Sequence, residues 1–197
     1  VVLTNGSKGS NDPKITREEI IKIRHQEQRD AAKVLGLKDV IFLDHEDCEL
    51  EANVQTKGEV VKVVRKLKPD VVITFDPSRF YSIRDNYYNH TDHRACGQIV
   101  ADAVFPLSHS HLMYPEHLTD GLEPHKTPEL WLTNFDNANF FIDISKTIDK
   151  KLEALASHKS QVGDMKEVKK WVTHWAKAMG KKSRKFELAE GFIRFQF

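Results

Sequence analysis

The sequence predicts an α/β protein with a mostly parallel sheet, and three observations support this class. Short runs rich in β-branched residues alternate with longer segments of helical period, which is the order of βαβ units. The run 71–75, Val-Val-Ile-Thr-Phe, is apolar enough to be buried on both faces, as strands inside parallel sheets are. The 197 residues are 40% hydrophobic, which suffices for one core, so we expect a single domain over residues 1–197.

The first half of the chain has the pattern of two strand-helix units followed by a third strand. The expected elements are strands at 1–4, 40–43 and 71–75 and helices at about 16–35 and 56–67. Thr16 and Glu19 have the spacing of a capping box, which predicts where the first helix begins. Gly36 is suited to the left-handed conformation that commonly ends a helix.

The second half continues the same alternation after a long connection that contains several prolines and histidines. The expected elements are helices at about 92–104, 145–158 and 166–179 and strands near 130–133 and 140–144. This order predicts a Rossmann-like three-layer fold. Open parallel sheets bind ligands beyond the carboxyl ends of their strands, so the loops 5–10, 44–50 and 76–90 should converge on one crevice.

No single sign of charge dominates the chain, since 30 Lys and Arg stand against 29 Asp and Glu, a net charge of +1. We therefore expect a small-molecule partner, not nucleic acid or an anionic membrane surface. No apolar run approaches the roughly 18 residues that a membrane span needs.

Cys48 and Cys96 are too few for a disulfide framework, which favours a reducing, cytoplasmic location. The segment 6–10 has neither a dinucleotide-binding nor a P-loop glycine spacing.

The residues with the clearest chemistry are His90 and His93, at the start of a predicted helix. Two histidines three apart project from one face of a helix, close enough to bind a single metal ion or one substrate. Such a pair also arises by chance in a chain with 10 histidines. The pair is not a complete site, because catalytic zinc takes three protein ligands and keeps one position for water.

The residues around this pair resemble a known family. The run 67–77, Leu-Lys-Pro-Asp-Val-Val-Ile-Thr-Phe-Asp-Pro, followed by 88–94, Tyr-Asn-His-Thr-Asp-His-Arg, is similar to the LmbE-like (PIG-L) N-deacetylases. Residues 4–9 resemble the T-x-G-x-x-G loop of that family, and residues 24–27 resemble its R-x-x-E helix. The resemblance extends over nearly the whole chain, and the order of the motifs agrees.

The resemblance implies zinc-dependent hydrolysis of the N-acetyl group of an N-acetylglucosamine-type sugar conjugate. It implies that His93 is a zinc ligand and that His90 contacts the reacting amide, with Asp92 orienting His90. Iron(II) or another divalent ion could replace zinc in such a site. The structural alternative for Asp92 is that it serves as a helix N-cap or as a first-turn acid. A homo-oligomer is left open by the sequence.

The resemblance also nominates Arg24, Asp76 and Tyr88 as residues that bind the sugar. Each of the three has a structural alternative. Arg24 could pair with Glu27 or Gln28 on the helix surface, Asp76 could cap the Pro77 turn, and Tyr88 could be a packing residue.

One family motif has no match in this sequence. Family members carry an A-H-P-D-D-E segment that supplies a His and an Asp as zinc ligands and a second Asp as general base. The family places that segment before the T-x-G-x-x-G loop, so we expect it upstream of Val1, together with the N-terminal strand and the first metal-binding loop. The alternative is a non-catalytic sugar-binding relative without a complete metal site.

Overall fold

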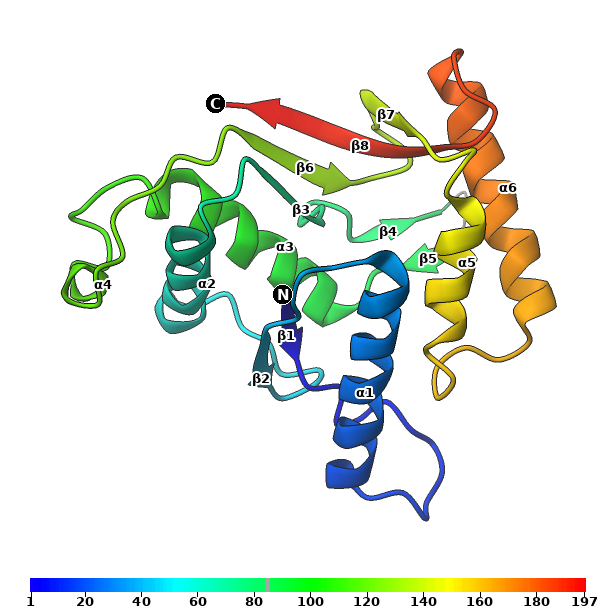
Figure 1. Ribbon diagram of the computed structural model, residues 1–197, viewed down its shortest axis with the longest axis horizontal. Helices are drawn as coiled ribbons and strands as arrows, with labels where there is room; N and C mark the ends of the chain where they lie inside the picture. Colours follow the sequence, from blue (N-terminus) through cyan, green and yellow to red (C-terminus); the bar gives the residue numbers. More distant parts are fainter. Residues whose placement is uncertain (84–85) are drawn as a thin grey trace. The chain divides into compact units, whose positions relative to one another are not determined.

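The computed structural model describes residues 1–83 and 86–197 and confirms a mixed α/β protein (Figure 1). The chain forms two compact units. Unit 1 comprises Val1–Glu49 and Phe141–Gly191, and unit 2 comprises Leu50–Phe140 and Phe192–Phe197. The single domain expected from the sequence stays a prediction.

Unit 1 combines a pair of parallel strands with three helices. Its elements are β1 (Val2–Thr4), α1 (Arg17–Leu35), β2 (Phe42–His45), α5 (Ile148–Ala156) and α6 (Met165–Ser183). The capping box is confirmed, because Thr16 Oγ1 accepts the Glu19 N–H at 3.2 Å and the Glu19 carboxylate accepts the Thr16 N–H at 2.8 Å. Gly36 ends α1 with a φ of 75°, as predicted. Helix α5 contacts both α1 and α6.

Unit 2 contains strands β3 and β6 of the longer sheet, a short hairpin and three helices. Its elements are α2 (Val54–Leu67), β3 (Val71–Phe75), β4 (Tyr81–Ser82), β5 (Tyr87–Tyr88), α3 (Thr91–Asp102), α4 (Glu116–Thr119) and β6 (Glu129–Thr133), with a kinked π-helical segment at Ala103–Leu107. Helix α3 contacts both α2 and β3.

The longer sheet has the strand order β3-β6-β8-β7, where β7 is Phe140–Asp143 and β8 is Ala189–Gln196. Strands β3 and β6 are parallel, in a register that pairs Val71 with Glu129, whereas β6 and β8 are antiparallel. Strands β4 and β5 form a separate antiparallel hairpin. Mixed pairing is therefore present, and the Rossmann-like, mostly parallel arrangement stays a prediction.

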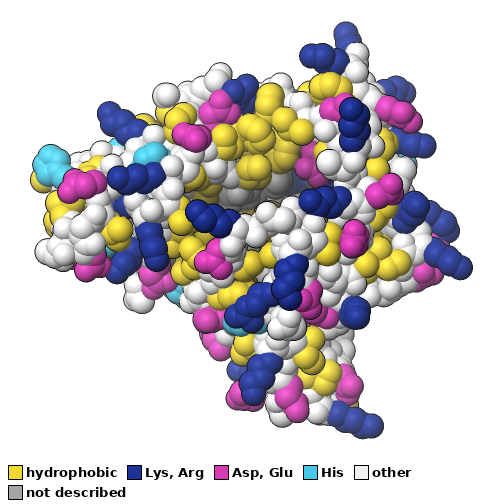
Figure 2. Space-filling view, in the orientation of Figure 1, with side chains coloured by type: hydrophobic (Ala, Val, Ile, Leu, Met, Phe, Trp, Pro, Cys, Tyr) yellow, Lys and Arg dark blue, Asp and Glu magenta, His cyan; other side chains and the backbone are white. Residues whose placement is uncertain are grey.

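Strand β3 differs from its prediction in one respect. Thr74 is buried, but Val71, Ile73 and Phe75 on the opposite face are 38%, 53% and 38% exposed. Burial of this strand on both faces is therefore not observed. Figure 2 shows hydrophobic side chains gathered over the region of β6.

The face drawn in Figure 2 carries basic and acidic side chains side by side, which agrees with the small net charge. Among residues 1–83 and 86–197, none of the helices combines the length and the apolar character needed to cross a bilayer. Within the described residues, Cys48 and Cys96 are not joined by a disulfide bond.

Candidate functional site

Helix α3 begins at the two histidines that the sequence singled out. His90 has extended backbone dihedral angles and is the N-cap of α3, and its Nδ1 accepts the N–H of Asp92 at 3.2 Å. His93 lies one turn further along, with ring centroids 5.3 Å apart. The expected placement of this pair at a helix start is therefore confirmed, although His90 precedes the helix as its cap.

His93 lies in a half-buried position against the end of strand β3. Its ring stacks on Phe75 with a centroid distance of 4.2 Å and an interplanar angle of 9°. Burial lowers the pKa of His93, the neighbouring His90 lowers it further, and Asp92 opposes the shift. The ring is therefore neutral near pH 7, which is the form that binds a metal ion.

Asp92 occupies the first turn of α3 and is only 5% exposed. Its Oδ1 accepts the N–H of Leu50 at 3.4 Å, and its Oδ2 lies 4.0 Å from Nδ1 of His90. The carboxylate is thus a first-turn acid that also lies beside the imidazole. Asp92 is therefore not the N-cap of α3, because that position belongs to His90, whereas its place as a first-turn acid is confirmed. Its role in orienting His90 stays a prediction.

The donor atoms at this end of α3 fit a zinc ion. The neutral imidazole of His93 is a typical zinc ligand, and the imidazole and carboxylate beside it are also of types that zinc accepts. The aromatic ring of Phe75 fixes the orientation of His93 from one side. The role of His93 as the metal ligand stays a prediction.

In unit 1, two of the loops that the sequence predicted to converge do meet. Asn5 Nδ2 and Ser7 Oγ donate to the carboxylate of Glu46 at 3.3 and 2.8 Å, and the Lys8 N–H donates to Asp47 at 3.3 Å. Hydrogen bonds from Ser7 and Asn5 lower the pKa of Glu46. The loop after β1 is therefore fastened to the loop after β2.

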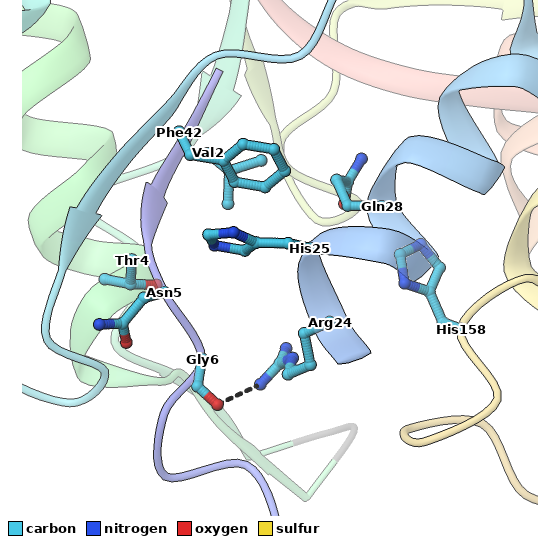
Figure 3. Close-up of a pocket in the computed structure, with 9 residues that line it drawn as sticks. All are labelled: Val2, Thr4, Asn5, Gly6, Arg24, His25, Gln28, Phe42 and His158. Atoms are coloured by element: carbon cyan, nitrogen blue, oxygen red, sulfur yellow. Dashed lines mark hydrogen bonds between the residues drawn. The ribbon is translucent and has the colours of Figure 1, made fainter. Parts of the chain in front are cut away.

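Arg24 reaches from α1 over the glycines of the first loop (Figure 3). Its Nη1 donates to the carbonyl of Gly6 at 3.5 Å and lies 3.9 Å from the carboxylate of Asp47. A Cβ on Gly6 would lie 2.7 Å from the guanidinium, and a Cβ on Gly9 would lie 2.3 Å from it. The T-x-G-x-x-G spacing therefore makes room for the arginine. Within residues 1–83 and 86–197, the polar contacts of Arg24 are with the loops after β1 and β2.

A small polar pocket of about 100 Å³ lies beside Arg24. Figure 3 shows Arg24, His25 and Gln28 extending into it from α1, with His158 on another segment of unit 1. His25 stacks on Phe42 at 3.9 Å between ring centroids, and its Nε2 lies 3.1 Å from Asp44. The contacts of Arg24 with Gly6 and Asp47 are long and both involve Nη1. Because a guanidinium has five N–H donors, Arg24 can donate further hydrogen bonds to a ligand in this pocket.

The glutamate of the R-x-x-E segment has a role that the residues alone did not indicate. Glu27 is buried and accepts the N–H and the Oγ–H of Ser160 at 2.6 and 2.7 Å. The next residue, Gln161, donates to the carbonyl of Gly9 at 2.9 Å. In the sequence, the signal for Glu27 is the resemblance of residues 24–27 to the R-x-x-E helix of the family.

Asp76 directly follows β3 and is 4% exposed. Its Oδ1 accepts the N–H and the Oγ–H of Ser78 at 2.8 and 2.6 Å, and its Oδ2 accepts from Nδ2 of Asn134. Asp76 therefore shapes the turn after β3, as its structural alternative predicted. Contact of Asp76 with a substrate stays a prediction.

Tyr88 lies on β5 and is 72% exposed, so it is not a packing residue of the core. Unit 2 thus holds Tyr88, Asp76, His90, Asp92 and His93, and unit 1 holds Arg24.

Comparison with known proteins gives a consistent result. Residues 1–104 match the family model described as PIG-L, GlcNAc-PI de-N-acetylase. The chain is 32% identical over 161 residues to a diacetylchitobiose deacetylase of Thermococcus kodakarensis, covering 82% of this chain and 58% of that protein. It is 32% identical over 176 residues to a probable N-acetyl-alpha-D-glucosaminyl L-malate deacetylase 2 of Bacillus anthracis, covering 82% of this chain and 67% of that protein.

Two solved structures share the fold. An N,N'-diacetylchitobiose deacetylase from Pyrococcus horikoshii superposes with a TM-score of 0.88 at 27% identity, over 98% of this chain and 71% of that chain. The 4-carboxy-2-hydroxymuconate hydratase GalB from Pseudomonas putida superposes with a TM-score of 0.74 at 18% identity, over 98% of this chain and 81% of that chain, which shows the fold alone. The chain thus spans only part of the length of the relatives that it matches.

Proposed function

This chain belongs to the PIG-L (GlcNAc-PI de-N-acetylase) family, and from that membership we propose that the protein containing it is a metal-dependent N-deacetylase. The proposed substrate is an N-acetylglucosamine-type sugar conjugate, and the products are acetate and a free amine. One observation carries the proposal: the segment matched by the family model includes Arg24 and the histidine pair, and the structure places that pair at the start of α3, directly against the end of β3.

Hydrolysis of an acetamide adds the oxygen of water to the acetyl carbon and breaks the bond between that carbon and nitrogen. The departing amine takes up a proton. We propose that His90 donates this proton from Nε2 as an imidazolium ion, because a neutral imidazole is too weak an acid to protonate an amine. The carboxylate of Asp92 lies 4.0 Å from Nδ1 of His90, where it can accept the Nδ1–H of the imidazolium in place of the backbone contact of the neutral ring.

His93 is the residue that we expect to hold the metal ion, and zinc is the ion that its neutral imidazole best fits. When bound, zinc supplies Lewis acidity that allows water to attack an amide near neutral pH. Two further protein ligands are needed, and the family's A-H-P-D-D-E segment is their expected source. Iron(II) stays an alternative ion.

For the sugar, we propose Arg24 and Tyr88 as direct contacts and Asp76 as a contact or as a support of the loop after β3. The guanidinium of Arg24 can donate hydrogen bonds to hydroxyl and carbonyl oxygens of the sugar.

We also propose a Rossmann-like three-layer arrangement for the complete domain. A cytoplasmic location is proposed as well, because two cysteines are too few for the disulfide framework of a secreted protein.

The test uses the full-length protein that contains this chain. Bound zinc is measured by elemental analysis, and acetate release is measured with N-acetylglucosamine and with N,N'-diacetylchitobiose. Chelation should abolish acetate release, and added zinc should restore it. His93→Ala should lose bound zinc and activity, whereas His174→Ala, which removes an exposed histidine on α6, should lose neither.

Two results would contradict the proposal. Full-length protein that binds sugar but neither zinc nor another divalent metal, and releases no acetate, would be a non-catalytic sugar-binding relative. Acetate release that persists at full rate after chelation would exclude the metal-dependent mechanism.

A further inference from the structure

The hairpin β4–β5 concentrates the tyrosines of this chain beside the candidate catalytic residues. Three of the four tyrosines, Tyr81, Tyr87 and Tyr88, lie on it. Tyr81 and Tyr88 are Cα partners across the two strands, so their side chains lie on the same face of the hairpin. This pairing places two amphipathic rings next to one another.

The two faces of the hairpin differ in what they contact. On one face, the hydroxyl of Tyr87 donates to Asn89 at 2.7 Å, and the guanidinium of Arg79 lies 4.9 Å from the centre of the Tyr87 ring. On the other face, Tyr81 and Tyr88 are 61% and 72% exposed. Two exposed aromatic rings that adjoin one another offer a flat, partly apolar contact area to a ligand.

Arg94 supports the Tyr88 side of this surface. Its guanidinium lies 4.6 Å from the ring centre of Phe80 and 5.6 Å from that of Tyr88, and its Nη1 donates to the carbonyl of Asn89. Arg94 belongs to α3, the helix that His90 caps. The Tyr88 ring is therefore in contact with the same helix that carries the histidine pair, which lowers the entropy cost of binding a ligand on that ring.

We propose that Tyr81 and Tyr88 form a stacking surface for a second pyranose ring, so that the substrate is an N-acetylglucosamine joined to another sugar. This proposal rests on the proposed deacetylase function. A pyranose has an apolar face of C–H groups, which suits an aromatic ring, and a rim of hydroxyls, which suits the donors of Arg94 and His90. Tyr88 precedes His90 by two residues, about 7 Å of extended chain, so a sugar on Tyr88 is adjacent to one whose acetamide meets His90.

The test compares a monosaccharide with a disaccharide in the full-length protein. The ratio of kcat/KM for N,N'-diacetylchitobiose to that for N-acetylglucosamine is measured for the wild type and for Tyr88→Ala, Tyr88→Phe and Tyr81→Ala. Removal of a stacked ring should lower this ratio about tenfold in both alanine variants. Tyr88→Phe keeps the ring and should keep the ratio. Trp171→Ala removes a ring of α6 that is 53% exposed and should leave the ratio unchanged.

A second measurement separates this proposal from the deacetylase function itself. Saturation-transfer NMR reports binding of the disaccharide without any need for turnover. Binding that is present in the wild type and weakened in Tyr88→Ala supports the stacking surface even if no acetate is released. Unchanged ratios and unchanged binding in both alanine variants, or no binding by the wild type, would overturn it, while acetate release by the wild type would still support the deacetylase function.

Discussion

The backbone N–H of Asp92 donates to Nδ1 of His90 at 3.2 Å, so the imidazole of His90 is the cap of helix α3. An Nδ1 that accepts this bond cannot carry the proton of the neutral ring, which leaves that proton on Nε2. One side chain thus fixes the start of a helix and presents the N–H that we assign to proton donation. The two roles can be separated by substitution.

His90→Asn should keep the first role and lose the second. Asparagine is a good N-cap, so the melting temperature should stay close to that of the wild type, whereas kcat for acetate release should fall by about 100-fold or more. His90→Ala should lose both, with a decrease in the free energy of unfolding of about 1 kcal/mol. Thermal unfolding followed by circular dichroism and an acetate assay measure the two effects. Wild-type turnover in His90→Asn would show that His90 does not transfer a proton.

Gly97→Ala should destabilise the contact between α3 and β3. A Cβ at this position would lie 2.5 Å from the carbonyl oxygen of Phe75 and 3.0 Å from the nitrogen of Pro77, and both are backbone atoms that cannot rotate away. We expect a loss of about 2 kcal/mol in the free energy of unfolding, measured by urea denaturation. Gln98→Ala, at the exposed neighbouring position, is the matched control and should change stability little. Equal stability of both variants would mean that α3 does not pack on β3 as described.

Gly9→Ala should displace Arg24 without unfolding the protein. The new Cβ would lie 2.3 Å from Nη1 of Arg24, which is the far end of a flexible side chain. If Arg24 binds the sugar, KM should rise about tenfold, as expected for the loss of a hydrogen bond to a charged group. Gly163→Ala, whose Cβ would meet nothing within 4 Å, is the control.

A double variant tests whether the effect passes through Arg24. Gly9→Ala combined with Arg24→Ala should be no worse than Arg24→Ala alone, because the two substitutions remove the same contact. Additive increases in KM would show that Gly9 acts independently of the arginine.

Local signals explain which parts of the fold were predictable. Helix α1 was predicted within one residue because the bonds that begin it, between Thr16 and Glu19, join residues three apart in the sequence. Strand β2 was expected at 40–43 and lies at Phe42–His45, since few local signals mark where a strand begins. The strand β8 was not predicted. Its burial depends on pairing with β6, more than 50 residues away in the chain, and Arg194 and Gln196 interrupt its apolar pattern.

In the candidate site, too, the features marked by local sequence signals were predictable, and those that depend on tertiary structure were not. The spacing of His90 and His93 was informative because it lies within one helical turn. The position of Arg24 over Gly6 and Gly9 was not, because tertiary structure brings these residues together. The hairpin β4–β5 was also missed, since strands of two residues each leave no periodic pattern to detect.

Glu129 should give the protein a dependence of stability on acid pH. It lies on β6 and accepts hydrogen bonds from Arg194 and from Nε1 of Trp131, and these bonds lower its pKa from 4.5 to about 2. Because the carboxyl of the unfolded chain takes up a proton at higher pH than that of the folded chain, this stabilisation is complete above pH 4.5 and is lost as the pH falls toward 2. Urea midpoints measured between pH 6 and pH 2.5 should therefore fall less steeply in Glu129→Gln than in the wild type. Glu153→Gln, at an exposed position on α5, should follow the wild-type profile, and a Glu129→Gln profile parallel to that of the wild type would contradict the assignment.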